Sequence, residues 1–418
     1  GRSWDRICFV GSLLFGLGCL LAPKEAGTMS EQGLFFGAGF LFTAAGVSAC
    51  SILIRRFLKP SSVISSINAL GRQHAVRRRG RSLAVVGLMA AGVFMVTAIN
   101  SFRLDGARGA ERRTSGTGGF AFVGEATLPI YEDLNGDAGR EKYGLDDLPV
   151  EFSVYPFRIS EGEDASCLNL NRAQRPRLMA TDESRLAELR PFSFTKEEEA
   201  ENGEGWSLLS GAPEVNKEGI LVIPGIVDQN TATYALQKGL GDLVIYETVS
   251  GQTFAVRIAG FLDTSILQGN LIISEKNFIH FFPDAGGYQF FLIDGEATKS
   301  LEIVANHMSR MFGDLGLEMR PAAERLNEFN AVQNTYLSIF STLGGLGIFL
   351  GTLGLAIVVG RNVLERRSQL GVMQAIGFTR EMLAKMVLAE HWFLHAFGVL
   401  LGFVSALVAV YPQLLKGF

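Results

Sequence analysis

Three polar side chains in the first half of the chain have a spacing that could bind a cation. Asp133, Asn135 and Asp137 match the first, third and fifth ligands of a calcium-binding loop, in which oxygen atoms surround a hard cation. The sixth position of such a loop needs a glycine and the twelfth a glutamate, but here they are Ala138 and Gly144. A solvated Asn-Gly turn is therefore a better interpretation than a calcium site.

A second cluster lies in an apolar stretch near the end of the chain. His391 and His395 are four residues apart, so they share a helix face and could ligate a metal, but no third ligand is near in the sequence. We therefore predict no metal site. Ionisable residues inside a membrane helix are functional candidates, and Glu390 and His391 are the two chosen here. We expect Glu390 to face other helices or the cytoplasmic interface and to pair with an arginine.

Catalytic signatures are absent from the sequence. It contains no G-x-x-x-x-G-K-[ST] phosphate-binding loop, no H-E-x-x-H, no G-x-S-x-G and no paired-cysteine metal motif. Cys167 is interpreted as a structural thiol, because no histidine occurs in residues 103–278. Asp228 is expected to cap the following helix through Asn230 or Thr231. We predict no catalytic residue, no cofactor and no enzymatic activity.

The elements that would carry these residues are largely membrane helices. Of the 418 residues, 48% are hydrophobic and only 19% are charged, against about 25% charged in soluble proteins. This excludes a wholly soluble enzyme, a disordered chain and a collagen-like fibre. Uncharged stretches that are long enough, or nearly so, to cross a membrane occur at 7–22, 33–54, 82–102, 330–360 and 392–415. We predict a polytopic α-helical membrane protein with five spans, the first being the shortest.

The distribution of charge predicts the orientation of these spans. Residues 103–333 carry 21 basic and 36 acidic residues, whereas the rest of the chain carries 17 basic and 6 acidic ones. Fifteen of those 17 basic residues flank the spans on one side, and short basic loops remain in the cytoplasm. We therefore predict a multi-pass plasma (inner) membrane protein with a cytoplasmic N-terminus and residues 103–333 outside the cytoplasm.

Two further segments have patterns typical of membrane contact. Residues 61–81 are too polar to span, but their apolar residues recur at helical spacing before an arginine cluster, which predicts a helix lying on the inner leaflet. The arginines fit topology or lipid binding better than nucleic acid. In the fourth span, Gly347 and Gly351 have the GxxxG spacing that lets helix backbones approach closely.

Residues 103–333 are predicted to form a large α+β domain of two lobes, divided near residues 196–204. Aromatic and β-branched residues predict strands at 120–131, 151–159, 220–224, 243–248, 253–262, 270–274 and 288–293. Helical periodicity occurs at 231–238, 275–282, 297–312 and 321–333, and we expect the last to continue into the fourth span. Gly251 is expected to supply the turn of a hairpin between 243–248 and 253–262.

The segment after the fourth span combines a charged turn with a short amphipathic helix. Its residues include Glu365, Arg366, Arg367, Gly371, Ala375 and Gly377, which fill the pattern ERRxxxGxxxAxG. This pattern resembles the FtsX-like permease family of ABC transporters. The order of span, large outer domain, span, short helix and span is similar to MacB-type and lipoprotein-releasing permeases. Val372, Met373 and Ile376 are expected to form the apolar face of the helix, and Gly377 to end it.

The resemblance implies a permease subunit, homodimeric or heterodimeric, whose short helix couples it to a separate ABC ATPase. ATP hydrolysis would then move the outer domain to export or extract a lipoprotein, a lipid or an amphiphile. The implied partners are that ATPase, membrane lipid, and a substrate or protein outside the cytoplasm, with no nucleic acid. The alternative is a transmembrane signalling or scaffold protein that activates cell-wall hydrolases.

These observations divide the chain into four parts. Residues 1–60 form two linker spans, 61–102 an interfacial helix and a span, 103–333 the outer domain, and 334–418 the FtsX-like segment of span, coupling helix and span. The first residue is Gly1, and the fourth helix expected of such a module is missing after Phe418. We therefore expect a fragment of a two-module permease.

Overall fold

The computed structural model describes residues 2–21, 31–57, 79–101, 103–162, 175–199, 204–248, 250–295 and 298–416. Cys167 and all but the last three residues of the interfacial segment 61–81 lie outside this range. The chain forms two compact units. Residues 1–103 and 335–418 form the first, which we call the helical unit, and residues 104–334 form the second, which we call the sheet domain.

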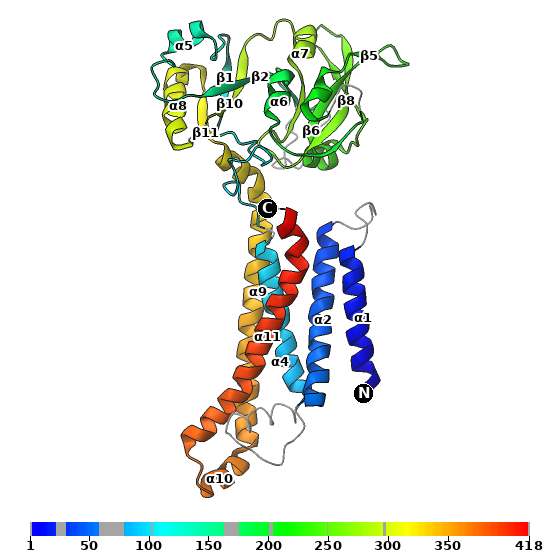
Figure 1. Cartoon of the computed structure of the whole chain (residues 1–418), viewed down its shortest axis with the longest axis vertical. Coiled ribbons are helices and arrows are strands. Elements are labelled where there is room, and N and C mark those ends of the chain that lie inside the picture. Colours follow the sequence, from blue (N-terminus) through cyan, green and yellow to red (C-terminus); the bar gives the residue numbers. More distant parts are fainter. Residues whose placement is uncertain are drawn as a thin grey trace. The chain divides into compact units, whose positions relative to one another are not determined.

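The described part of the helical unit consists of six helices. They are α1 (Arg2–Leu21), α2 (Glu31–Phe57), α4 (Arg79–Ser101), the second part of α9 (Ala322–Glu365), α10 (Arg367–Ala375) and α11 (Arg380–Lys416) (Figure 1). Four described helices, α2, α4, α9 and α11, are long and apolar enough to cross a membrane. In α1, charged residues occupy the first turns, and residues 7–21 reach only about 22 Å across a core of about 30 Å. The count of five spans is therefore not confirmed.

Small residues bring α11 and α4 close together. A Cβ atom on Gly398 would lie 3.0 Å from the carbonyl oxygen of Val86, and a Cβ atom on Gly402 would overlap the carbonyl oxygen of Ala90. Ala406, one turn beyond Gly402, is fully buried. Gly398 and Gly402 have the GxxxG spacing, which removes the side chains that would otherwise hold the two backbones apart.

The contact of α9 with α4 is looser. A Cβ atom on Gly351 would meet the side chain of Leu88, but no atom lies within 4 Å of a Cβ atom on Gly347. No residue whose side chain is described in the most apolar stretch of α9 is buried within the structure. The GxxxG spacing predicted on α9 is therefore not a close-packing face in the described structure, because only one of its two glycines touches another helix.

The sheet domain is built on a mixed sheet of eleven strands (Figure 1). The strands are β1 (Phe122–Ile130), β2 (Ser153–Ser160), β3 (Arg177–Thr181), β4 (Phe194–Glu197), β5 (Glu214–Val215), β6 (Leu221–Asp228), β7 (Leu243–Glu247), β8 (Thr253–Leu262), β9 (Asn270–Ser274), β10 (Tyr288–Asp294) and β11 (Glu318–Pro321). The order is β11-β1-β10-β2-β3-β9-β6-β8-β4, with β5 beside β6 and β7 beside β8. The pairs β3–β9 and β6–β8 are parallel. The large mixed domain agrees with the predicted class.

Helices cover this sheet and separate its apolar clusters. They are α5 (Asp137–Tyr143), α6 (Glu183–Leu189), α7 (Glu275–Phe281), α8 (Thr298–Met311), two short 3₁₀ segments at Gly205–Ser210 and Gly313–Leu315, and a π-helical segment at Thr231–Leu236. One cluster joins β1 and β10 to α8 and includes Phe122, Phe291 and Val304. Another joins β6, β8 and β9 to α7 and includes Phe254 and Phe278.

The predicted division of this domain near residues 196–204 is wrong. The strand β4 begins before this segment and ends within it, and it pairs with β8, which follows the segment, so that Phe194 lies opposite Leu262. One half of the sheet instead contains β1, β2, β10 and β11, which come from the two ends of the domain sequence. The strands between them in sequence, β3 to β9, form the other half. The lobes are nested in the sequence and not consecutive.

The two ends of the sheet domain are hydrogen-bonded to each other. The backbone N–H of Leu104 donates to Oδ1 of Asn334 (3.0 Å), and Nδ2 of Asn334 donates to the carbonyl oxygen of Leu104 (2.7 Å). Two residues later, the N–H of Gly106 donates to Oδ1 of Asn327 (2.7 Å). Hydrogen bonds from the first turns of α9 therefore fix the position of the segment that enters the domain.

Candidate coupling site

The helix α9 ends in a pair of charged residues. The guanidinium Nε of Arg361 lies 2.9 Å from Oε1 of Glu365, one turn later on the helix surface. The backbone of Arg366 leaves the helical region (φ −98°, ψ 6°), which stops α9 and starts α10. The carbonyl oxygen of Arg366 accepts the first bond of the new helix from Leu370 N (2.9 Å). A single residue therefore separates the two helices and turns the chain.

The other end of α10 is closed by a glycine in a positive-φ conformation. Gly377 has φ +105°, which side-chain-bearing residues rarely adopt. Its N–H donates to the carbonyl oxygen of Gln374 (3.0 Å), and the N–H of Phe378 donates to that of Met373 (3.0 Å). These two bonds form a Schellman cap, which satisfies carbonyl groups at the helix end. The structure thus places the end of α10 where the sequence predicts it.

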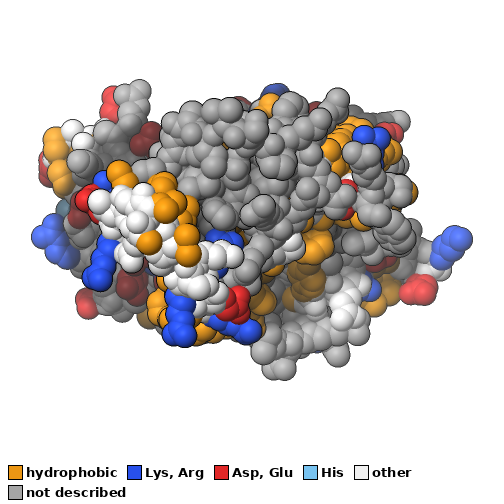
Figure 2. Space-filling view, turned by 90° about the horizontal axis from the view of Figure 1, so that it is seen from below, with side chains coloured by type: hydrophobic (Ala, Val, Ile, Leu, Met, Phe, Trp, Pro, Cys, Tyr) orange, Lys and Arg blue, Asp and Glu red, His pale blue; other side chains and the backbone are white. Residues whose placement is uncertain are grey.

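The outer face of α10 is apolar and uncovered. Val372 is 63% exposed and Ile376 is 71% exposed, while Met373 between them is half-buried. Gly371 and Ala375 are also exposed, and no residue of α10 is buried. The helical unit thus places the predicted apolar residues on one short helix with little cover from the rest of the described chain. Seen from the end that carries α10, Lys and Arg side chains surround hydrophobic ones (Figure 2).

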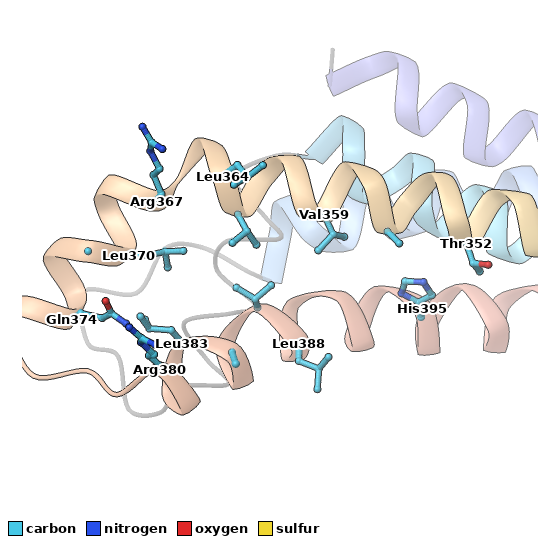
Figure 3. Close-up of a pocket in the computed structure, with 15 residues that line it drawn as sticks. Thr352, Val359, Leu364, Arg367, Leu370, Gln374, Arg380, Leu383, Leu388 and His395 are labelled. Carbon is cyan, nitrogen blue, oxygen red and sulfur yellow. The ribbon is translucent and has the colours of Figure 1, made fainter.

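The opposite face of α10 lines a groove of about 750 Å³ together with α9 and α11 (Figure 3). Four residues of α10, spaced at one side of the helix, contribute: Arg367, Leu370, Gly371 and Gln374. The α9 wall is Thr352, Ala356, Val359, Val363 and Leu364, and the α11 wall is Arg380, Leu383, Ala384, Val387, Leu388 and His395. Most of these side chains are apolar, and the two arginines lie at the α10 end.

The candidates Glu390 and His391 belong to α11, but their side chains lie outside the described residues. The neighbouring His395 is described and lines the groove, with Thr352 on the α9 side (Figure 3). Among the described residues, no group of three His, Cys, Asp or Glu side chains could hold a metal.

The candidate calcium loop has a structural role in the sheet domain. Oδ1 of Asp133 accepts from the backbone N–H of Asn135 (2.9 Å), which makes a tight turn. The amide of Asn135 exchanges two 2.8 Å hydrogen bonds with the backbone of Val154 on β2. Asp137 starts α5. Because Asp133 and Asn135 make these local bonds, the turn interpretation agrees with the structure.

The predicted cap at Asp228 is present. Its Oδ2 accepts from the N–H of Thr231 (2.9 Å), and its Oδ1 accepts from the N–H of Gly269 (3.1 Å) and from the Thr231 hydroxyl. Burial raises the pKa of the Asp228 carboxyl, while these hydrogen bonds oppose that rise. The hairpin of β7 and β8 also forms, with Gly251 at φ +82° in its turn.

Sequence reasoning missed the groove. Its walls come from α9 and α11, and the inward positions on α11 repeat at three and four residues, as in Arg380, Leu383, Ala384 and Val387. That repeat was readable in the sequence, but in a membrane helix every face is apolar. The repeat therefore gives no sign of which face is turned toward α9.

Comparison with known proteins supports an assignment of the C-terminal part. Residues 341–416 match the family model for the FtsX-like permease C-terminal region. An uncharacterised ABC transporter permease of Methanocaldococcus jannaschii is 22% identical over 150 residues, which are 35% of this chain and 36% of that protein. The match thus spans about a third of that relative's length.

Two solved structures are also similar. The periplasmic region of MacB from Actinobacillus actinomycetemcomitans is 12% identical, with a TM-score of 0.27, over 52% of this chain and 95% of that one. The extracellular domain of the noncanonic ABC-type transporter YknZ from Gram-positive bacteria is 14% identical, with a TM-score of 0.25, over 48% and 99%. Residues 341–416 are therefore similar to the C-terminal region of FtsX-like permeases, and part of the chain is similar to an ABC transporter permease.

Proposed function

We propose that this chain is the permease subunit that couples ATP hydrolysis by a separate ABC ATPase to movement of the sheet domain, and that this movement exports or extracts a lipoprotein, a lipid or an amphiphile. The observation that carries the proposal is the exposed apolar face of α10 between two candidate membrane spans. Val372 and Ile376 are largely exposed at a position where aqueous solvent would otherwise surround them.

Apolar burial dominates the proposed contact with the ATPase. Each of Val372, Met373 and Ile376 contributes roughly 1.5–3 kcal/mol if it becomes fully buried. A surface ion pair made by Arg366 or Arg367 contributes only about 0–1 kcal/mol. The arginines therefore orient the partner, while the apolar residues supply most of the affinity.

The helix α9 supports transmission of movement from this contact. It runs without a break for 44 residues, from Ala322 to Glu365, and so extends for about 66 Å. Within the sheet domain its beginning is firmly attached. Ala322 is fully buried and its N–H donates to the carbonyl oxygen of Ala121 (3.0 Å), and Leu326 packs in the core. Displacement of Glu365 therefore acts on a helix that is anchored at its other end.

Charge supports the proposed orientation and location. The basic residues that flank the candidate spans lie in short connecting segments, which remain cytoplasmic, and the acidic sheet domain lies outside the cytoplasm in this proposal. The membrane is the plasma (inner) membrane, and the permease works as a homodimer or heterodimer. Because the sequence has no phosphate-binding loop, the chain itself neither binds nor hydrolyses ATP.

A photo-crosslinking residue on α10 tests the proposal. Placed at Val372 in cells that carry the native transporter, it should crosslink to a protein with a G-x-x-x-x-G-K-[ST] loop, identified by mass spectrometry. The same residue at Leu370, on the groove face, is the matched control and should give at most a weak product. Crosslinking only at Leu370, or no ATPase at either position, would contradict the assignment of the outer face.

Val372→Asp should weaken this contact. Loss of one buried valine and introduction of a charge should reduce co-purification of the ATPase at least tenfold, which corresponds to ~1.4 kcal/mol. Gln374→Asp adds the same charge to the opposite face of the same helix, which lines the groove, and should have little effect on this co-purification. Capture of a cell-wall hydrolase by the sheet domain, with no dependence of its activation on ATP, would favour the signalling alternative.

A further inference from the structure

The groove between α9, α10 and α11 has the features of a site for a membrane lipid. Its volume of about 750 Å³ falls within the range of roughly 300–1,000 Å³ that is usual for small-molecule sites. We propose that an anionic phospholipid of the surrounding leaflet occupies this groove, with its phosphate at Arg380 and an acyl chain along α9 and α11. The proposal requires only that α9 and α11 are membrane-embedded, and it holds with or without the ATPase contact.

The dimensions of the groove fit one leaflet. Along α9 the lining residues extend from Thr352 to Leu364, which is about 18 Å at 1.5 Å per residue. Half of a hydrocarbon core of about 30 Å is about 15 Å deep. An acyl chain that enters beside Leu388 can therefore remain against apolar side chains over its full depth in the leaflet, because Val359 and Val387 continue the walls.

Charge complementarity selects the head group. Arg380 lies at the aqueous end of α11, where the candidate span begins, and Figure 3 shows its guanidinium directed toward Gln374. Among the described residues, the ion pairs nearest in sequence are Arg361–Glu365 and Lys385–Glu381, and neither includes Arg380. Arg367 lines the same end of the groove, although its guanidinium points away from α11 (Figure 3). Basic pockets between membrane helices at the cytoplasmic surface bind anionic head groups, and the Arg380 fork can hold a phosphate through two N–H donors.

The two faces of α10 then have different occupants. Gln374 and Leu370 face the groove, whereas Val372 and Ile376 lie on the opposite, exposed side. A lipid in the groove fills the space between the end of α9 and the start of α11. It therefore supports α10 from behind while leaving the outer face free.

Tryptophan quenching by brominated lipid tests the site directly. Trp392 is 75% exposed and lies one turn from both Leu388 and His395, so it reports on the groove side of α11. Trp206 is buried in the sheet domain, and Trp4→Phe removes the remaining tryptophan. The full chain in mixed micelles is titrated with dibrominated phosphatidylglycerol or dibrominated phosphatidylcholine of the same acyl chains. Phosphatidylglycerol should quench at an about fivefold lower mole fraction, the factor that matches ~1 kcal/mol per basic residue near the surface.

Three variants separate a site from general surface attraction. Arg380→Ala should abolish the preference for phosphatidylglycerol, and Arg380→Lys should retain part of it. Lys385→Ala is the matched control, because Lys385 is basic, exposed and on the next turn of α11, but pairs with Glu381 (2.7 Å) and does not line the groove. It should leave the preference unchanged. Ala384→Phe fills the groove without changing charge and should reduce quenching by both lipids.

The outcomes decide the proposal. Equal quenching of the parent chain by the two lipids would overturn it. Equal loss of preference in Arg380→Ala and Lys385→Ala would show surface attraction only and would also overturn it. Undiminished quenching of Ala384→Phe by both lipids would place the lipid elsewhere and would overturn the proposal. Circular dichroism and gel filtration of each variant confirm that the helical unit remains folded.

Discussion

The two halves of α11 have opposite environments. In the second half, Gly398 and Gly402 bring the helix against α4 so closely that a side chain would not fit. In the first half, Leu383 and Leu388 line the groove, and α9 forms its other wall. The same helix is therefore closely packed against α4 at one end and lines a groove at the other. The candidate coupling helix is attached to the end that lines the groove.

The largest expected effect comes from adding a side chain to the closely packed half of α11. Gly402→Leu forces a side chain against the carbonyl oxygen of Ala90 and should lower the stability of the helical unit by about 3 kcal/mol, the upper end for overpacked cores. Gly347→Leu makes the same substitution in the other GxxxG spacing, where a Cβ atom meets no neighbour. Thermal unfolding in detergent measures both. Equal losses would mean that the two glycine motifs are equally packed, contrary to this comparison.

A smaller effect is expected at the end of α10. Gly377→Ala places a side chain at φ +105°, and left-handed backbone costs roughly 1–2 kcal/mol for such residues. Gly371→Ala, inside the same helix and with no atom near its Cβ position, should instead favour α10 by up to about 1 kcal/mol. Hydrogen exchange of residues 367–378 should rise in the first variant and fall in the second. A shift in the same direction in both would refute the Schellman cap as the stop signal.

The smallest effect is expected where α9 meets solvent. Arg361→Ala breaks an ion pair whose arginine is 79% exposed, and exposed i,i+4 pairs contribute only about 0.3–0.5 kcal/mol. The melting temperature of the chain should therefore hardly change, and added salt should not enlarge the difference. A loss above about 1 kcal/mol would show that the end of α9 is covered, and a partner that covers this end would then be needed.

The sequence predicted individual strands and helices better than it predicted which of them pair or pack together. The strand at 270–274 and the hairpin of β7 and β8 follow directly from local patterns. The short strands β3, β4 and β11 were missed, since four or five residues give little periodicity. The nested halves of the sheet were missed for a different reason. Pairing of β1 with β10 joins residues far apart in the chain, and no local signal reports it.

The two GxxxG motifs show the same limit in the membrane helices. Gly347–Gly351 and Gly398–Gly402 have identical spacing, and only the first was considered as a packing face from the sequence. The structure uses the second, because Ala90 and Val86 of α4 lie opposite it. Spacing states that a close approach is possible, whereas the residue on the facing helix decides whether it occurs. Likewise the sequence contains Arg380, the arginine of the groove, but it gives no sign of the lipid-sized space beside that residue.

The bonds between Leu104 and Asn334 make the sheet domain an exchangeable cassette. Its entry and exit points are adjacent, so the domain can be lengthened, shortened or replaced while the ends of the flanking helices keep their separation. Selection can then act on residues 104–334 without changes in the helical unit. The same helical unit can in this way carry different domains between α4 and α9.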